Sequence, residues 1–180
     1  MTRVLIVMSL LLLSTSVIAD ANDGEYLGFK LGDTYSLPRD SVGRPHYIGA
    51  LTYVVEAETR HQHLDSLSVN VSPQSSTIGG IFGEWYFPTE RIAKSFADGY
   101  LQGLEQKYGD WRRRRSSLTN GHYQFWVDLE QRPPIVDHWP SSKPFRVSTA
   151  LLFAPDSAAQ RAWIAKINAE ADGRRLSARK

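Results

Sequence analysis

The segment from His61 to Asp65 carries the one cluster in the chain with a spacing typical of metal ligands, His-x-His-x-Asp. In an extended segment alternate side chains point to the same side, so we expect His61, His63 and Asp65 to lie together. Imidazole and carboxylate groups are ligands that zinc accepts in proteins. The same residues also suit a polar hairpin turn in contact with water. The spacing therefore gives a candidate metal site, with a solvated turn as the alternative interpretation.

Signatures of catalysis are absent from the sequence. It has no Gly-x-Ser-x-Gly motif and no Ser-x-x-Lys motif at the start of a predicted helix, which are marks of common serine hydrolases. Glu84 stands beside Trp85 and Tyr86, and Glu56 and Glu58 lie in or next to a predicted strand. Carboxylates near aromatic rings suit a glycan-cleaving site, but they also suit the wet face of any sheet. The catalytic residues are therefore left unknown, and no cofactor is predicted.

A block of four arginines, Arg112, Arg113, Arg114 and Arg115, follows Trp111 directly. Guanidinium groups bind phosphate and carboxylate through paired hydrogen bonds. We expect the block to lie in a loop just past a helix, as a candidate binding site for an envelope protein, an anionic lipid or a glycan. The alternative is a solvated basic loop near a helix C-terminus, where cations are favoured. We expect no nucleic acid partner, because an exported protein does not meet it and because aromatic residues are not interleaved with basic ones as on a stacking surface.

Aromatic residues form a second group of candidate binding residues. Trp85 lies in a segment rich in glycine and aromatic residues, and Trp126 lies in a predicted strand. Strand alternation places Trp126 on the face opposite Tyr123, Phe125 and Val127. Trp126 therefore needs a second layer, a partner or partial exposure to water. Aromatic residues of this kind can line a groove for a peptide, a lipid or a glycan, and the alternative is that they form core.

The first 19 residues have the pattern of a secretory signal peptide. Arg3 precedes an apolar run from Val4 to Leu13, and Val17-Ile18-Ala19 offers a cleavage site. The apolar run is too short to span a membrane, so we expect no transmembrane anchor after cleavage. The chain has no cysteine and so can form no disulfide. These features predict a periplasmic or secreted protein that begins near Asp20.

Composition predicts one folded domain. Hydrophobic residues make up 42% of the chain and charged residues 22%, values typical of a globular protein. A formal net charge of +2 does not indicate a polyanionic partner. We expect a single domain over residues 20–173 and a basic tail over residues 174–180, which carries Arg174, Arg175, Arg179 and Lys180.

Hydrophobic periodicity predicts the elements of this domain. Alternating residues indicate strands over 51–58, 67–72 and 123–129. We expect two further strands, one over 78–87 that bends at its glycines and one over 145–153. A helix begins at Thr89 and ends at Tyr108, a long loop covers 131–144, and a last helix follows Pro155. This order of elements is typical of α+β proteins. We expect one two-layer domain, in which two main helices pack on one face of an antiparallel sheet.

Together these observations favour a small exported protein of the bacterial envelope that binds rather than catalyses. The alternative is a periplasmic hydrolase, either metal-assisted or carboxylate-based. The sequence leaves the partner and the oligomeric state open.

Overall fold

The computed structural model describes residues 23–37, 43–46, 49–55, 64–109, 111–131 and 142–177. The predicted signal peptide lies outside these ranges, as do His61, His63 and most of the loop predicted over 131–144. Among the residues that are described, no helix is long and apolar enough to cross a membrane.

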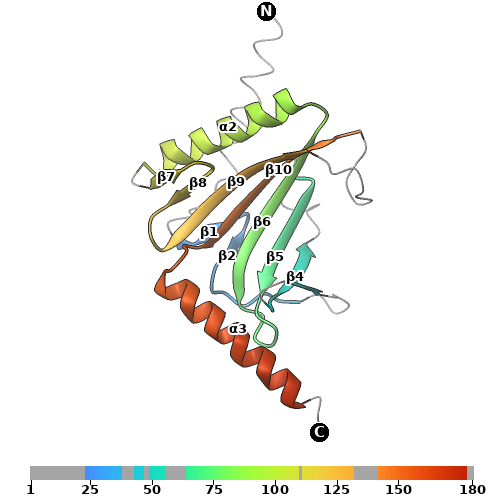
Figure 1. Ribbon diagram of the computed structural model, residues 1–180, viewed down its shortest axis with the longest axis vertical. Coiled ribbons are helices and arrows are strands. Elements are labelled where there is room, and N and C mark those ends of the chain that lie inside the picture. The colour runs from blue at the N-terminus through green and yellow to red at the C-terminus, as the bar shows by residue number, and fades with distance from the viewer. Residues whose placement is uncertain are drawn as a thin grey trace, which may run out of the picture.

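Most strands belong to one large sheet, and Figure 1 shows their arrangement. In chain order the elements are β1 (Glu25–Tyr26), β2 (Phe29–Lys30), β3 (Arg44–Pro45), β4 (Leu51–Val55), β5 (Ser66–Val71), β6 (Ile78–Phe87), α2 (Glu90–Lys107), β7 (Arg112–Arg114), β8 (Ser117–Thr119), β9 (Tyr123–Gln131), β10 (Phe145–Phe153) and α3 (Ala158–Ser177). The eight strands from β3 to β10 are ordered β3-β4-β5-β6-β10-β9-β8-β7, and every neighbouring pair is antiparallel. The predicted α+β class with an antiparallel sheet is confirmed.

The sheet consists of two consecutive meanders that meet at its centre. Strands β3 to β6 form the first meander and β7 to β10 the second, and each is followed by a helix. The last strands of the two meanders, β6 and β10, pair with each other. The central part of the sheet is therefore β5-β6-β10-β9.

The core lies on the face of the sheet that α2 covers, which we call the inner face. Alternate residues of the central strands point to it, including the fully buried Ile81, Val147 and Phe125. Helix α2 begins where the Thr89 side chain accepts a hydrogen bond from the Ile92 amide. The helix buries one side against β6, β8, β9 and β10, namely Ala93, Tyr100, Leu101 and Leu104.

The hairpin of β1 and β2 completes this core. Leu27 and Gly28 have φ values of 49° and 78°, the left-handed geometry that a tight two-residue hairpin turn requires. Tyr26 is fully buried, and its hydroxyl hydrogen-bonds the hydroxyls of Tyr100 and Thr149. Burial raises the pKa of the Tyr26 hydroxyl, so it stays protonated at neutral pH. The hairpin thus ties α2 to the sheet.

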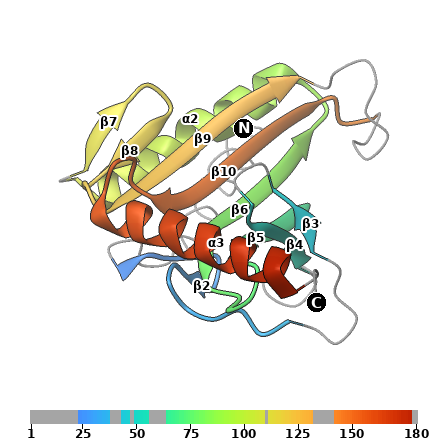
Figure 2. The same ribbon diagram turned by 60° about the horizontal axis from the view of Figure 1, so that its bottom comes forward.

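Helix α3 lies across the end of the central strands, as Figure 2 shows. Trp163 packs against Gly79, where a Cβ atom would come within 2.0 Å of its ring, and Ile167 joins Trp163 and Ala50 in a small apolar cluster. The turn between β5 and β6 holds the helix further along, because Gln74 and Ser75 hydrogen-bond the Glu170 carboxylate. This cluster is separate from the main core, and Phe153 packs against both.

Candidate functional site

The face of the sheet opposite α2, which we call the outer face, gathers most of the polar side chains of the central strands. Alternation along β6 turns Phe82, Glu84 and Tyr86 outward, because Ile81 and Trp85 point into the core. The pairing of the strands then identifies their neighbours on β5 and β10, and beyond β10 the outward residues of β9. The outer residues of the central strands are Ser66, Ser68, Asn70, Gly80, Phe82, Glu84, Tyr86, Arg146, Ser148, Ala150, Leu152, Gln124, Trp126, Asp128 and Glu130.

Strand register arranges these residues in rows that cross the sheet. One row is apolar and contains Phe82, Ala150 and Trp126 side by side. The next row contains Glu84, Ser148 and Asp128, and the third contains Tyr86, Arg146 and Glu130. Each row is two residues along the strands from the next, about 7 Å. The outer face therefore carries an apolar row beside two polar rows.

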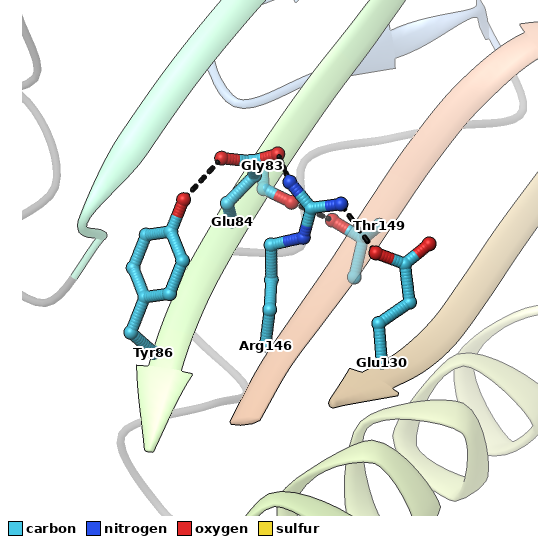
Figure 3. Close-up of polar contacts among 6 residues, drawn as sticks. All are labelled: Gly83, Glu84, Tyr86, Glu130, Arg146 and Thr149. Carbon is cyan, nitrogen blue, oxygen red and sulfur yellow. Dashed lines mark hydrogen bonds and ion pairs between the residues drawn. The ribbon is translucent and has the colours of Figure 1, made fainter. Parts of the chain in front are cut away.

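The third row is built around Arg146, as Figure 3 shows. Arg146 Nη1 donates to Glu84 Oε1 at 2.8 Å, and Arg146 Nη2 donates to Glu130 Oε2. Tyr86 donates its hydroxyl proton to Glu84 Oε2 at 2.9 Å. The guanidinium thus fixes carboxylates from β6 and β9 above the strand between them.

Charge and burial set the protonation of this row. Partial burial by itself would lower the pKa of Arg146, but the Glu130 hydrogen bond and the charges of Glu84 and Glu130 outweigh it and raise that pKa. Burial and the charge of Glu84 raise the pKa of Tyr86 to about 12. Arg146 is therefore charged and Tyr86 is protonated throughout the physiological pH range.

Asp128 differs from the other carboxylates of the outer face. It is half-buried and lies on β9 between Trp126 and Glu130, directly opposite Ser148. Within the described ranges, its carboxylate has neither an ion pair nor a hydrogen bond. Its neighbour Trp126 is also half-buried, so it retains the partial exposure that the strand pattern required. These two residues can contact a ligand without breaking an existing interaction.

The candidate metal site is represented only by Asp65. Its Oδ1 pairs with Lys143 Nζ at 3.0 Å, and its Oδ2 accepts the Tyr86 amide at 2.9 Å. His61 and His63 lie outside the described residues, as do Glu56 and Glu58. No group of three possible metal ligands occurs in the part of the chain that the structure describes. Asp65 is engaged in joining the start of β5 to the end of β6.

The arginine block forms a β-hairpin, where the sequence analysis predicted a loop. Arg112–Arg114 is β7, the edge strand of the sheet, and Arg115 has a φ of 49° in the turn to β8. The correction has a physical cause: pairing with β8 satisfies backbone groups that a loop would leave to water. Arg113 Nη1 pairs with Glu105 of α2 at 2.8 Å. The block therefore forms the edge of the sheet, and one of its side chains, Arg113, contacts helix α2.

Arg112 also lines an open cleft of about 710 Å³ beside the start of α3. Its other lining residues are Thr119, Asn120, Gly121, Gln124, Ala154, Pro155 and Asp156. The lining comes from residues 112–124 and from residues 154–156, two stretches that are distant in sequence, and no local motif in the sequence indicates the cleft.

Trp85 belongs to the core. It is 8% exposed and packs against Phe96 and Tyr100 of α2, with ring centroids 5.2 and 5.6 Å away. This burial leaves Trp85 no surface for a ligand. Of the two candidate tryptophans, the structure places Trp126 alone on the outer face.

Sequence reasoning missed Asp128, Glu130 and Arg146. The alternation that placed Trp126 opposite Phe125 also places Asp128 and Glu130 on its side. That signal was present, but the partnership with Arg146 depends on the pairing of β9 with β10.

Comparisons with protein-family models, with curated proteins and with solved structures found no match.

Proposed function

We propose that this chain is a small exported binding protein of the bacterial envelope, periplasmic in location, and that the outer face is its binding surface. Residues 20–173 form its one two-layer domain, in which α2 packs on the inner face and α3 lies across the end of the central strands. An envelope protein is its partner. No catalytic step is part of this function.

The observation that carries the proposal is the apolar row beside the polar rows on the outer face. Phe82 and Trp126 are half-buried, and among the described residues neither belongs to the main core or to the small cluster around Trp163. Side chains of this size on an outward position retain apolar surface that a partner can cover. Interfaces are rich in such aromatic residues, with arginine and other polar groups around them. The Arg146 row supplies that polar border.

The alternative function, a hydrolase, has less support from the geometry. Both oxygens of Glu84 are occupied, Oε1 by Arg146 and Oε2 by Tyr86. A catalytic carboxylate must instead face the bond that is cleaved, with a second carboxylate across from it. Asp65, the described member of the metal candidate, has both oxygens engaged as well.

The proposal is tested by whether the Trp126→Ala variant still captures the cellular partner. We would crosslink cells that produce the tagged protein and compare the captured partners of the parent with those of Trp126→Ala. Ile92→Ala is the matched control, because Ile92 is an exposed apolar residue on α2. We expect Trp126→Ala to lose the partner and Ile92→Ala to keep it. Equal capture by both variants would contradict a binding role for the outer face.

A further inference from the structure

We propose that the partner segment on the outer face is an extended, basic stretch of polypeptide, in which an apolar side chain is followed two positions later by lysine or arginine. This inference rests on the proposed function and adds the chemistry of the partner to it. Three features of the outer face support it: its charge, the position of Trp126 and the spacing of the rows.

The charge of the two polar rows is negative. They contain three carboxylates, Glu84, Asp128 and Glu130, and one guanidinium, Arg146. Arg146 pairs with two of these carboxylates, Glu84 and Glu130. The third, Asp128, has no such pair within the described ranges. A cation that approaches Asp128 therefore gains an ion pair, whereas an anion is repelled by the net negative charge of the two rows, three carboxylates against one guanidinium.

Trp126 favours the same kind of partner. It lies two residues before Asp128 on β9, so both side chains point outward from one strand. The face of an indole ring attracts lysine and arginine cations. Trp126 also shares the apolar row with Phe82, with the buried Ala150 between them. A basic side chain at Asp128 and an apolar side chain on this row can therefore belong to the same ligand.

The spacing of the rows indicates an extended ligand. Successive rows are two residues apart along β9 and β10, about 7 Å. Alternate side chains of an extended peptide repeat at the same distance. A peptide that lies along these strands can thus place an apolar side chain on the row of Phe82 and Trp126 and its next inward side chain beside Asp128.

Two synthetic peptides test this inference by titration calorimetry on the purified protein. The first has the sequence Val-Ser-Lys-Ser-Val-Ser-Lys, and the second has glutamate in place of both lysines. We expect the lysine peptide to bind and the glutamate peptide to bind at least about tenfold more weakly, because exposed charges of opposite sign attract. The affinity for the lysine peptide should fall as salt is raised from about 0.05 to 0.5 M.

Asp128→Asn removes the charge and keeps the shape of the side chain. We expect it to weaken lysine-peptide binding by roughly three- to fivefold, the effect of one partly exposed ion pair. Asp98→Asn is the control, because Asp98 is an exposed carboxylate on α2. Equal affinities of these two variants, equal binding of the two peptides, or no binding of the lysine peptide at millimolar concentration would each overturn the inference.

The outcomes separate this inference from the proposed function. If Trp126→Ala abolishes capture of the cellular partner while the lysine peptide fails to bind, the outer face is a binding surface for a different chemistry and the inference falls alone. If Trp126→Ala leaves capture unchanged, the proposed function falls.

Discussion

Gly79 lies where the sheet has no room for a side chain. A Cβ atom at this position would lie 1.8 Å from the nearest atom of the Trp163 ring. We expect Gly79→Ala to push α3 away from the sheet and to lower the free energy of unfolding by roughly 1–3 kcal/mol, the usual cost of overpacking. Urea denaturation followed by tryptophan fluorescence measures this loss.

Gly109→Ala is the control for that prediction. A Cβ atom on Gly109 would meet its nearest neighbour, the Glu105 carbonyl oxygen, at 3.9 Å, an ordinary contact distance. Gly109→Ala should therefore unfold close to the urea concentration of the parent. A Gly79→Ala protein as stable as Gly109→Ala would show that Trp163 can move aside without cost.

At the level of residues, the sequence predicted which face of a strand a side chain occupies better than it predicted which other side chains it contacts. Alternation along 123–129 correctly separated Trp126 from Phe125, because strand geometry is local. The same reasoning did not show that Trp85 would be covered by α2 or that Arg146 would join Glu84 to Glu130. Those contacts depend on which strands and helices become neighbours, and no spacing within one segment encodes that choice.

At the level of elements, α2 supplies much of the core, but its residues do so unequally. Leu104 is fully buried, whereas Phe96 is half-buried against Trp85 and Phe87. Leu104→Ala should cost roughly 2–5 kcal/mol of unfolding free energy, and Phe96→Ala should stay below the roughly 3–5 kcal/mol typical of a fully buried phenylalanine. Urea midpoints of the two variants measure the difference, and Gln102→Ala on the exposed side should match the parent.

Strand β7 leads to a prediction about binding and one about solubility. Replacement of Arg112–Arg115 by serine should leave the fold intact, because Arg112, Arg113 and Arg115 are exposed and the Arg113–Glu105 ion pair lies at the surface. If the block binds anionic partners, the variant should bind anionic vesicles more weakly at low salt.

Equal vesicle binding by parent and variant would assign β7 another role, namely a charged edge strand that discourages pairing with other sheets. In that case, replacement of Arg112–Arg115 by threonine should promote aggregation through the edge strand. Light scattering of the concentrated protein should then be higher for this variant than for the parent.

The β7–β8 hairpin is an element that the sequence did not predict. The strand predicted over 145–153 has these bounds in the structure, and the alternating segment 123–129 lies within β9. A run of arginines has no alternation of apolar and polar residues, and arginine is not among the residues enriched in strands. Its strand structure comes from pairing with β8, which the segment itself does not specify.

At the level of the whole molecule, the attachment of α3 should depend on pH. Although partial burial opposes it, hydrogen bonds from Ser75 and from the Gln74 and Ser75 amides lower the pKa of Glu170. A carboxyl with a depressed pKa in the folded state adds stability above its unfolded pKa, and this contribution is lost as pH falls through the folded pKa. Acidification below about pH 4 should therefore weaken the link between α3 and the β5–β6 turn.

Glu170→Gln tests this link. The variant should unfold at a lower urea concentration than the parent at pH 7, and the difference between them should shrink as the pH falls through the depressed pKa of the parent carboxyl. Glu105→Gln serves as a comparison, because Glu105 is a carboxylate that pairs with Arg113 and not with the turn. A difference between parent and Glu170→Gln that stays constant with pH would contradict the assignment.

The pairing of β6 with β10 has a consequence for how the chain reaches its native state. The two central strands come from residues 78–87 and 145–153, so the middle of the sheet closes only after nearly the whole domain has been synthesised. Contacts between such distant segments raise the contact order, and proteins with high contact order fold slowly. Until β10 arrives, one edge of β6 presents unpaired backbone groups to other chains. A nascent chain that ends before β10 is therefore a substrate for chaperones and proteases rather than a folded half-domain.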